Sequence, residues 1–151
     1  MKGWLLDTNV LSEMARSKPD VGVLAWLRSL PEDRAFVSVL TIAEIDQGVA
    51  SLKTADPRRA TYETFRNRIE AEFAGRVTPL DDETIRLWGR LSGDYRREFG
   101  GKAPVIDTML AATATRRRLY LATRNAIEIG RLGCSVFNPW SDDVADFPLQ
   151  S

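Results

Sequence analysis

Four polar residues stand where chemistry could take place, each at the end of an expected strand or the start of an expected helix. Asp7 follows the apolar run WLL, Glu44 lies in the first turn of the helix expected after AFVSV, Asp107 follows Pro104 within a turn, and Asn125 follows LYLAT. Carboxylates gathered in one cleft repel one another unless a cation neutralises them. Their oxygens suit Mg²⁺ or Mn²⁺, ions that can activate a water and stabilise charge on a phosphate.

Helix capping is the simpler explanation for any one of these acids. A carboxylate near a helix N-terminus satisfies free N–H groups and the helix dipole. Asp107 favours a site, because its neighbours Val105, Ile106 and the run MLAA are expected to be buried. A buried acid is costly without a partner. Spacing alone therefore leaves both explanations open.

Short apolar runs alternate along the chain with longer amphipathic stretches, which predicts strands separated by helices and a mostly parallel sheet covered on both faces. Ligands in such folds bind beyond the carboxyl ends of the strands. The expected strands are 4–6, 35–39, 76–78, 119–122 and 135–137. The expected helices are 9–16, 21–30, 41–52, 57–73, 82–99 and 104–117. The second of these places Val21, Leu24, Ala25 and Leu27 on one face.

Composition excludes several classes of protein. The 151 residues, of which 21 are basic and 21 acidic, have no net charge, which argues against a protein that coats nucleic acid. There is no histidine, so Ser–His and Cys–His catalysis and histidine-bound zinc are excluded within the chain. A single cysteine, Cys134, and an opening stretch MKGWLLD that is too short for a signal peptide predict a cytosolic protein.

Five motifs follow one another between Leu5 and Trp140: DTNVLSE, SVLTIAEIDQG, PVIDTMLAATA, LATRN and VFNPW. In this order the sequence resembles PIN-domain ribonucleases, most closely the VapC and FitB-like toxins of type II toxin–antitoxin systems. The resemblance implies a three-layer α/β/α, Rossmann-like fold with a central, mostly parallel sheet. It also implies a single PIN domain over residues 1–151.

The resemblance assigns a role to each motif position. Asp7 and Asp107 would be the core Mg²⁺ ligands, with Mn²⁺ as a substitute, and Glu44 would bind the metal directly or through water. Asn125 stands where relatives often have an aspartate, which removes one charge and leaves the number of metals open. Glu128 would be a more distant acid, although a solvated helix surface is favoured for it.

The other motif residues would serve the substrate. Thr8 and Asn9 would shape the metal-binding turn. Thr8 would also lie beside the substrate, and Arg124 would approach a phosphate. The implied reaction is metal-dependent hydrolysis of an RNA phosphodiester, which agrees with the lack of an imidazole acid and base.

The resemblance further implies several partners. A VapB or FitA-like antitoxin would dock in a groove between the apolar helices near the N-terminus. Operator DNA would be bound only through that antitoxin, since the chain has no helix-turn-helix pattern. The chain would form a homodimer and a larger assembly with the antitoxin, with no membrane contact.

Arginine clusters and tryptophans each allow a functional and a structural explanation. The clusters could contact phosphates, although such clusters are routine on solvated helices; they are Arg58–Arg59, Arg96–Arg97 and Arg116–Arg118. The tryptophans could stack on bases, but most are expected in the core; they are Trp4, Trp26, Trp88 and Trp140.

Three alternatives to a ribonuclease differ from it in the residues that they require. A haloacid-dehalogenase-like phosphatase needs a second aspartate where Asn9 stands. A non-catalytic PIN-like binding module would have a degraded acidic site. Asn125, which stands where relatives often have an aspartate, is compatible with that alternative. A purely structural Rossmann-like domain leaves Asp107 unexplained, and no G-x-G-x-x-G or Walker A motif supports nucleotide binding.

Overall fold

A five-stranded parallel sheet with the order β3-β2-β1-β4-β5 forms the centre of the molecule. The computed structural model covers all 151 residues. Its strands are β1 (Gly3–Leu6), β2 (Ala35–Ser38), β3 (Val77–Thr78), β4 (Leu119–Ala122) and β5 (Val136–Phe137). Each boundary lies within one residue of the prediction, so the predicted α/β fold is confirmed.

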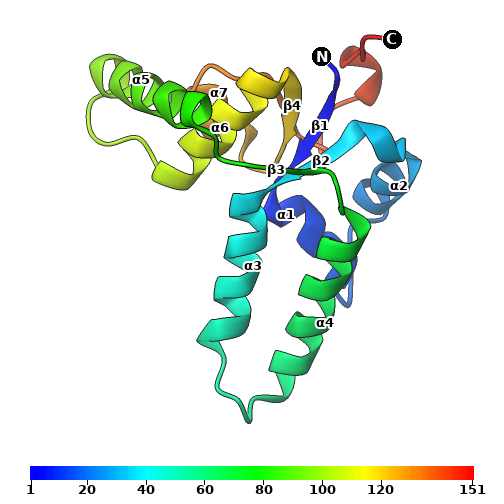
Figure 1. Cartoon of the computed structure of the whole chain (residues 1–151). Coiled ribbons are helices and arrows are strands. Elements are labelled where there is room, and N and C mark those ends of the chain that lie inside the picture. The colour runs from blue at the N-terminus through cyan, green and yellow to red at the C-terminus, as the bar shows by residue number, and fades with distance from the viewer.

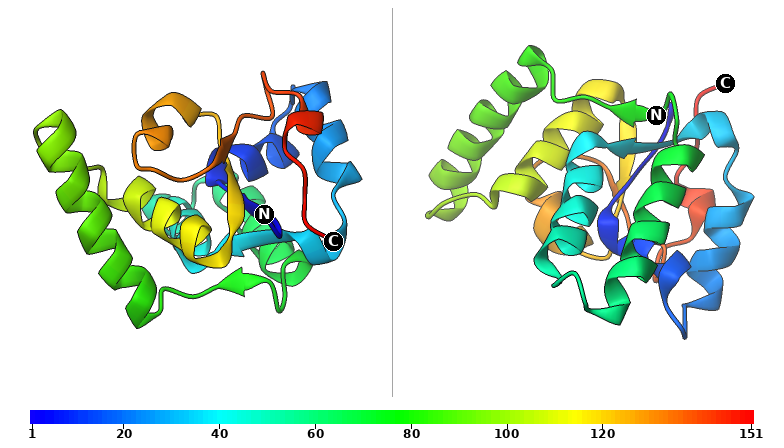
Figure 2. Two further views of the ribbon diagram at one scale, coloured as in Figure 1. Left: turned by 90° about the horizontal axis from the view of Figure 1, so that it is seen from above. Right: turned by 60° about the horizontal axis from the view of Figure 1, so that its bottom comes forward.

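Helices cover both faces of the sheet (Figures 1 and 2). They are α1 (Thr8–Leu11), α2 (Val21–Ser29), α3 (Val39–Ser51), α4 (Pro57–Glu72), α5 (Asp82–Phe99), α6 (Val105–Arg117) and α7 (Ala126–Gly130). Short 3-10 turns span Ser12–Ala15, Glu32–Arg34 and Val144–Asp146. Figure 1 shows α3 and α4 as a hairpin of helices that extends away from the sheet, with α5 and α6 on the other side. No helix of the chain is both long enough and apolar enough to cross a membrane.

The central strand β1 sends alternate side chains into two separate cores, as the period of a strand requires. Trp4 and Leu6 pack with α1–α4, whereas Leu5 packs with α6 and α7. Trp4 meets Trp26 edge to face at 5.4 Å. All four residues of β1 are buried, which explains why its sequence is continuously apolar.

The apolar face that the sequence indicates for α2 is not the face that enters the core. Val23 and Trp26 enter the core, while Val21 is 82% exposed. Leu24 and Leu27 instead line an open groove of about 580 Å³ between α2 and α4. Leu27 also packs against the core, whereas Leu24 is explained by the groove. Of the four tryptophans, Trp4 and Trp26 lie in the core as predicted, and Trp88 and Trp140 are half-buried.

The amino ends of the strands are closed by the C-terminal tail, which lies beside the N-terminus in Figure 2. The Gln150 backbone N–H donates to the Met1 carbonyl at 2.8 Å, and the Tyr120 hydroxyl donates to the Pro148 carbonyl at 3.1 Å. The acidic motif residues lie at the opposite, carboxyl ends of the strands. One edge of the sheet is thus sealed by the chain itself, and the other is left for a site.

Candidate active site

Asp7 lies at the carboxyl end of the central strand and is only 6% exposed. It is the N-cap of α1, where its Oδ1 accepts the Thr8 backbone N–H at 2.7 Å. Capping uses one oxygen only. The other, Oδ2, accepts the Thr123 hydroxyl at 2.7 Å and the Asn9 amide at 3.2 Å. Burial raises the pKa of Asp7, and the three hydrogen bonds oppose that rise.

Thr123 and Asn9 join the ends of β1 and β4 into one hydrogen-bonded unit. The Asn9 side-chain amide also donates to the Thr123 hydroxyl at 3.2 Å, and its Oδ1 accepts the Arg124 backbone N–H at 3.2 Å. The Asn125 N–H donates to the Thr123 hydroxyl, again at 3.2 Å. These contacts fix the orientation of the Asp7 carboxylate, because both of its oxygens have partners.

Glu44 approaches Asp7 from α3. The Thr8 hydroxyl donates to its Oε1 at 3.2 Å. The predicted place of Glu44 in the first helical turn is wrong, because Ser38 caps α3 and the helix begins at Val39. Glu44 therefore lies beyond the first turn, where helix capping cannot explain it. Burial and the charge of Asp7 raise its pKa.

Asp107 completes the group from the first turn of α6, which Pro104 precedes. It makes no hydrogen bond or ion pair, and burial, followed by the charges of Asp7 and Glu128, raises its pKa. The prediction that its neighbours are all buried is partly wrong. Val105 and Ile106 are 53% and 40% exposed, because the helix begins at the open edge of the sheet.

No cation of the protein neutralises this group of acids. None of Asp7, Glu44 and Asp107 takes part in an ion pair. As the side chains lie, no group of three or more acids in the chain, this one included, is arranged to hold a metal ion. Mg²⁺ needs only one or two carboxylates because it keeps several waters. The donor set, hard oxygens with uncompensated repulsion, therefore fits a hydrated divalent cation.

The remaining predicted residues lie around these acids. Asn125 is exposed at the start of α7 and makes no side-chain cap. The Arg124 guanidinium lies 5.1 Å from the centre of the Trp140 ring. Glu128 is exposed on α7, yet its charge reaches Asp107. Its exposure agrees with the solvated helix surface that the sequence favours for it.

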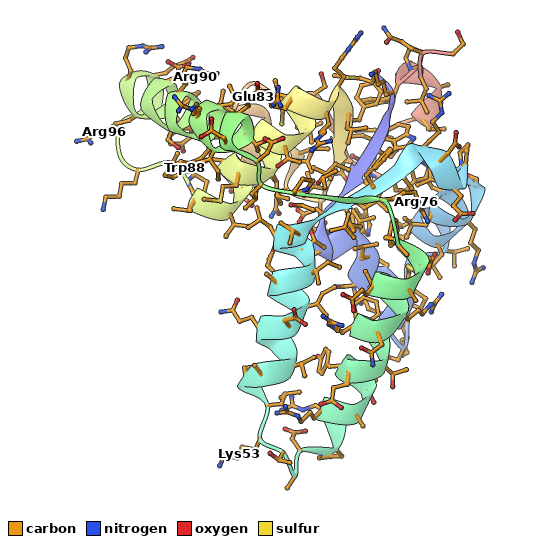
Figure 3. All side chains as sticks on the ribbon, viewed as in Figure 1. Lys53, Arg76, Glu83, Trp88, Arg90 and Arg96 are labelled. Atoms are coloured by element: carbon orange, nitrogen blue, oxygen red, sulfur yellow. The ribbon has the colours of Figure 1, made fainter.

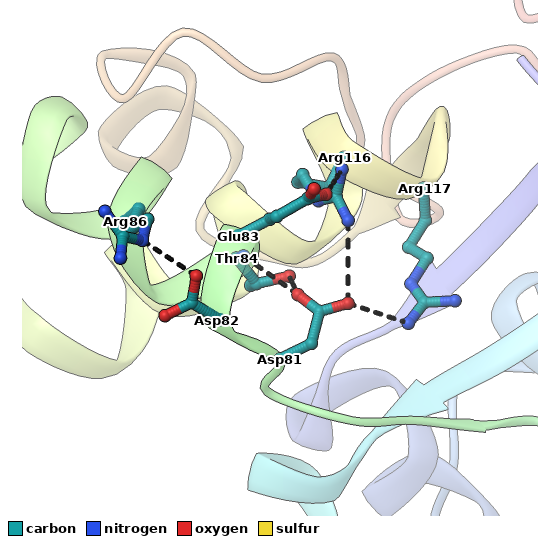
Figure 4. Close-up of polar contacts among 7 residues, drawn as sticks. All are labelled: Asp81, Asp82, Glu83, Thr84, Arg86, Arg116 and Arg117. Carbon is teal, nitrogen blue, oxygen red and sulfur yellow. Dashed lines mark hydrogen bonds and ion pairs between the residues drawn. The ribbon is translucent and has the colours of Figure 1, made fainter.

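Two of the three predicted arginine clusters are held by the protein itself. Figure 4 shows Arg116 and Arg117 joined to Asp81, at 3.6 and 3.5 Å, and Arg116 joined to Glu83. These contacts lie at the end of α6 remote from Asp107. Arg58 pairs with Asp56, and Arg59 pairs with Glu63, next to the turn of the α3–α4 hairpin. Of the three predicted clusters, only the one that contains Arg96 keeps an arginine without an ion pair or a side-chain hydrogen bond.

Comparison with known proteins decides the family. The model of the PIN-domain family matches residues 4–130 of the chain. The chain belongs to the PIN-domain family. Within the family it is 36% identical over 138 residues to Toxin FitB of Neisseria gonorrhoeae, a match that covers 91% of this chain and 99% of the toxin. It is 35% identical over 142 residues to VapC ribonuclease Y4jK of Sinorhizobium fredii, covering 90% of this chain and 96% of the relative.

Solved structures of the same group share this PIN fold. A structure of FitAB bound to an IR36 DNA fragment superposes with a TM-score of 0.82 at 34% identity and covers 93% of this chain and 97% of the other. FitAcB from Neisseria gonorrhoeae superposes with a TM-score of 0.80 at 35% identity, covering 91% and 98%. The predicted resemblance to FitB-like and VapC toxins is confirmed.

One residue of the candidate site was missed from the sequence. Thr123 is fully buried and bonds Asp7 directly, but the motif LATRN drew attention only to the residues after it. Its position was the available signal, because a polar residue that directly follows a buried parallel strand lies at the carboxyl edge of the sheet.

Proposed function

We propose that this chain is a metal-dependent endoribonuclease toxin of a type II toxin–antitoxin module, a single PIN domain over residues 1–151. It would hydrolyse RNA phosphodiester bonds in the cytoplasm until a cognate antitoxin neutralises it. The observation that carries the proposal is a set of three acids, Asp7, Glu44 and Asp107, without a basic partner and near enough that, after burial, their charges raise the pKa of Glu44 and Asp107. The names of the relatives, a toxin and a ribonuclease, support the same conclusion.

In this proposal Asp7, Glu44 and Asp107 hold Mg²⁺, or Mn²⁺ in its place. A bound ion of this kind supplies an activated water and stabilises the charge that develops on the phosphate. Thr123 holds the Asp7 carboxylate, and the Thr8 hydroxyl holds Glu44. The residues of the chain thus fix the two acids before any ion arrives.

Asn125, Thr8 and Arg124 complete the proposed site on the substrate side. Asn125 presents an exposed amide without adding negative charge. The backbone of Arg124 is fixed through Asn9, and its exposed guanidinium lies against Trp140. An arginine held in this way can hydrogen-bond two phosphate oxygens at once.

The antitoxin would dock in the groove between α2 and α4. The groove is lined mainly by apolar side chains, among them Leu24, Leu27 and Phe73, with Arg28 and Glu72 also in its lining. An amphipathic helix fits a surface of this kind. The FitAB–DNA structure supports a module in which operator DNA is reached through the antitoxin, and homodimerisation is part of the same proposal.

Substitution of the two core acids tests the proposal. Asp7→Asn and Asp107→Asn keep the size of each side chain and remove its charge. Incubated with total RNA and Mg²⁺ after removal of the antitoxin, each variant should lose more activity than the roughly 10–100-fold that an outer-shell change costs a metal site. Thermal unfolding should show that both variants stay folded. Full activity in either variant would refute the ligand assignment, and no cleavage by the wild type would favour a non-catalytic module.

A further inference from the structure

Arginines on the two sides of the acid group differ in whether the protein neutralises them. Helix α4 of the hairpin carries four arginines, and all of them pair with acids. The pairs are Arg58–Asp56 at 2.9 Å, Arg59–Glu63 at 3.0 Å, Arg66–Asp46 at 2.6 Å and Arg68–Glu72 at 3.7 Å. The hairpin therefore offers few cations that are free to meet an outside anion.

The opposite side has cations without partners. The last turn of α5, residues 100–104 and residues 126–131 form what is called here the α5–α7 rim. Arg96, Lys102 and Arg131 are exposed on this rim and have no acidic partner, whereas Arg97 pairs with Asp94 at 2.8 Å. The rim also carries two exposed acids without a basic partner, Glu98 and Glu128. Figure 3 shows Arg96 at the outer end of α5, far from Lys53 at the tip of the hairpin.

The rim adjoins the acid group along the chain and in space. Residues 100–104 lead directly into α6, whose first turn holds Asp107. Glu128 of α7 is close enough to Asp107 for its charge to act on that carboxylate. A strand of nucleic acid bound at the acids would therefore meet the rim within a few nucleotides.

An exposed aromatic residue accompanies the rim cations. Phe99 is 43% exposed, and the Arg131 guanidinium lies 5.6 Å from the centre of its ring. Tyr95 packs against Phe99 at 5.0 Å and lines a depression of about 200 Å³, whose charged lining is Arg97, Arg131, Asp94 and Glu98. Free cations combined with an aromatic face are typical of surfaces that bind single-stranded nucleic acid.

We propose that the α5–α7 rim binds the single-stranded RNA that flanks the scissile phosphate, with Lys102 and Arg131 contacting the backbone and Phe99 stacking on a base. This inference rests on the proposed ribonuclease function and adds to it the side from which the substrate enters. The hairpin contributes less to RNA binding than the rim does, because its four α4 arginines are paired with acids.

Two matched double variants test the inference. Lys102→Gln with Arg131→Gln changes the rim, and Arg58→Gln with Arg59→Gln changes the hairpin, so that each removes two positive charges. Both are made in the full-length Asp107→Asn protein, which binds without cutting. Affinity for a fluorescein-labelled single-stranded RNA of random sequence is measured by anisotropy at several salt concentrations with Mg²⁺ present. Thermal unfolding confirms that each variant is folded.

The rim variant should bind the RNA about tenfold or more weakly than its parent. The slope of log affinity against log salt concentration should become shallower by about 0.7 for each phosphate contact that is lost. The hairpin variant should stay within about twofold of its parent. Equal weakening in both variants, an unchanged rim variant, or no RNA binding by the parent would overturn the inference. Failure of the ribonuclease proposal is separate, because it would appear as wild-type protein that does not cleave RNA although the rim dependence of binding is retained.

Discussion

Two buried acids stand six residues apart in the motif DTNVLSE, and the protein treats them in opposite ways. Glu13 is 2% exposed and accepts the Asp20 backbone N–H and an Arg16 guanidinium N–H, each at 2.8 Å. The Asp20 N–H first, and then Arg16, hold the pKa of Glu13 below its ordinary value. Asp7 receives neutral donors only and faces further acids, and burial raises its pKa.

The difference distinguishes an acid that stabilises the fold, Glu13, from a candidate site residue, Asp7. Glu13 is satisfied within its own segment, so its charge favours the folded state. Asp7 is held in place without being neutralised, which costs stability that a bound cation would return. A buried acid whose hydrogen bonds orient it but leave its charge uncompensated is therefore the stronger candidate for a functional residue.

Among changes to the partners of these two buried acids, the largest expected effect comes from removing the Thr123 hydroxyl that supports Asp7. Thr123→Val keeps the shape of the side chain and deletes the hydroxyl that bonds Asp7. Loss of an outer-shell partner should lower RNA cleavage by about 10–100-fold at a given Mg²⁺ concentration. Thr113→Val is the matched control, because Thr113 is equally buried but bonds the Met109 carbonyl within α6. Equal loss of cleavage in both variants would remove the special role of Thr123.

Glu13→Gln should act on stability instead. Two hydrogen bonds to a buried charge are weakened, so the free energy of unfolding at pH 7 should fall by about 1–2 kcal/mol. The lowered pKa means that this contribution is present above about pH 4.5, the ordinary value, and is lost as the pH falls through the pKa of the folded state.

Urea unfolding from pH 7 down to pH 3 measures this change, and the gap between wild type and variant should narrow at the acid end. The exposed Glu63→Gln, paired with Arg59, is the control and should change little. A gap that widens below pH 4 would contradict the assigned role of Glu13.

The smallest effect is expected for the partner of Glu13. The Arg16 side chain is 55% exposed, and exposed ion pairs contribute little in water. Arg16→Gln should therefore lower the free energy of unfolding by less than about 1 kcal/mol, since the Asp20 N–H still holds Glu13. A loss as large as that of Glu13→Gln would show that the ion pair, and not the backbone donor, stabilises this acid.

The sequence predicted the sheet well because its central strands are buried on both faces and read as uninterrupted apolar runs. Helix α5 matched its predicted bounds as well, since Asp81 caps its start and Gly100 leaves the helix with a positive φ of 70°. In both cases the structure that the local sequence favours is also the one that the surrounding residues stabilise.

The predictions failed for residues whose environment is set by segments that are distant in the sequence. The α2 leucines face a groove that only the arrival of α4 creates, and apolar periodicity cannot distinguish a groove from a core. Thr123 was missed because its partner, Asp7, lies 116 residues away in the chain. Asp7 and Asp107 lie at a strand end and a helix start, as the pattern predicted, whereas Glu44 lies beyond the first turn of α3.

Thermal unfolding with increasing Mg²⁺, for antitoxin-free wild type and Asp107→Asn, tests the central claim most directly. Without metal, the variant should unfold at the higher temperature, because one of the mutually repelling charges is gone. Added Mg²⁺ should raise the unfolding temperature of the wild type by mass action and leave the variant almost unchanged. An equal rise in both proteins would contradict the claim that these acids form a metal site.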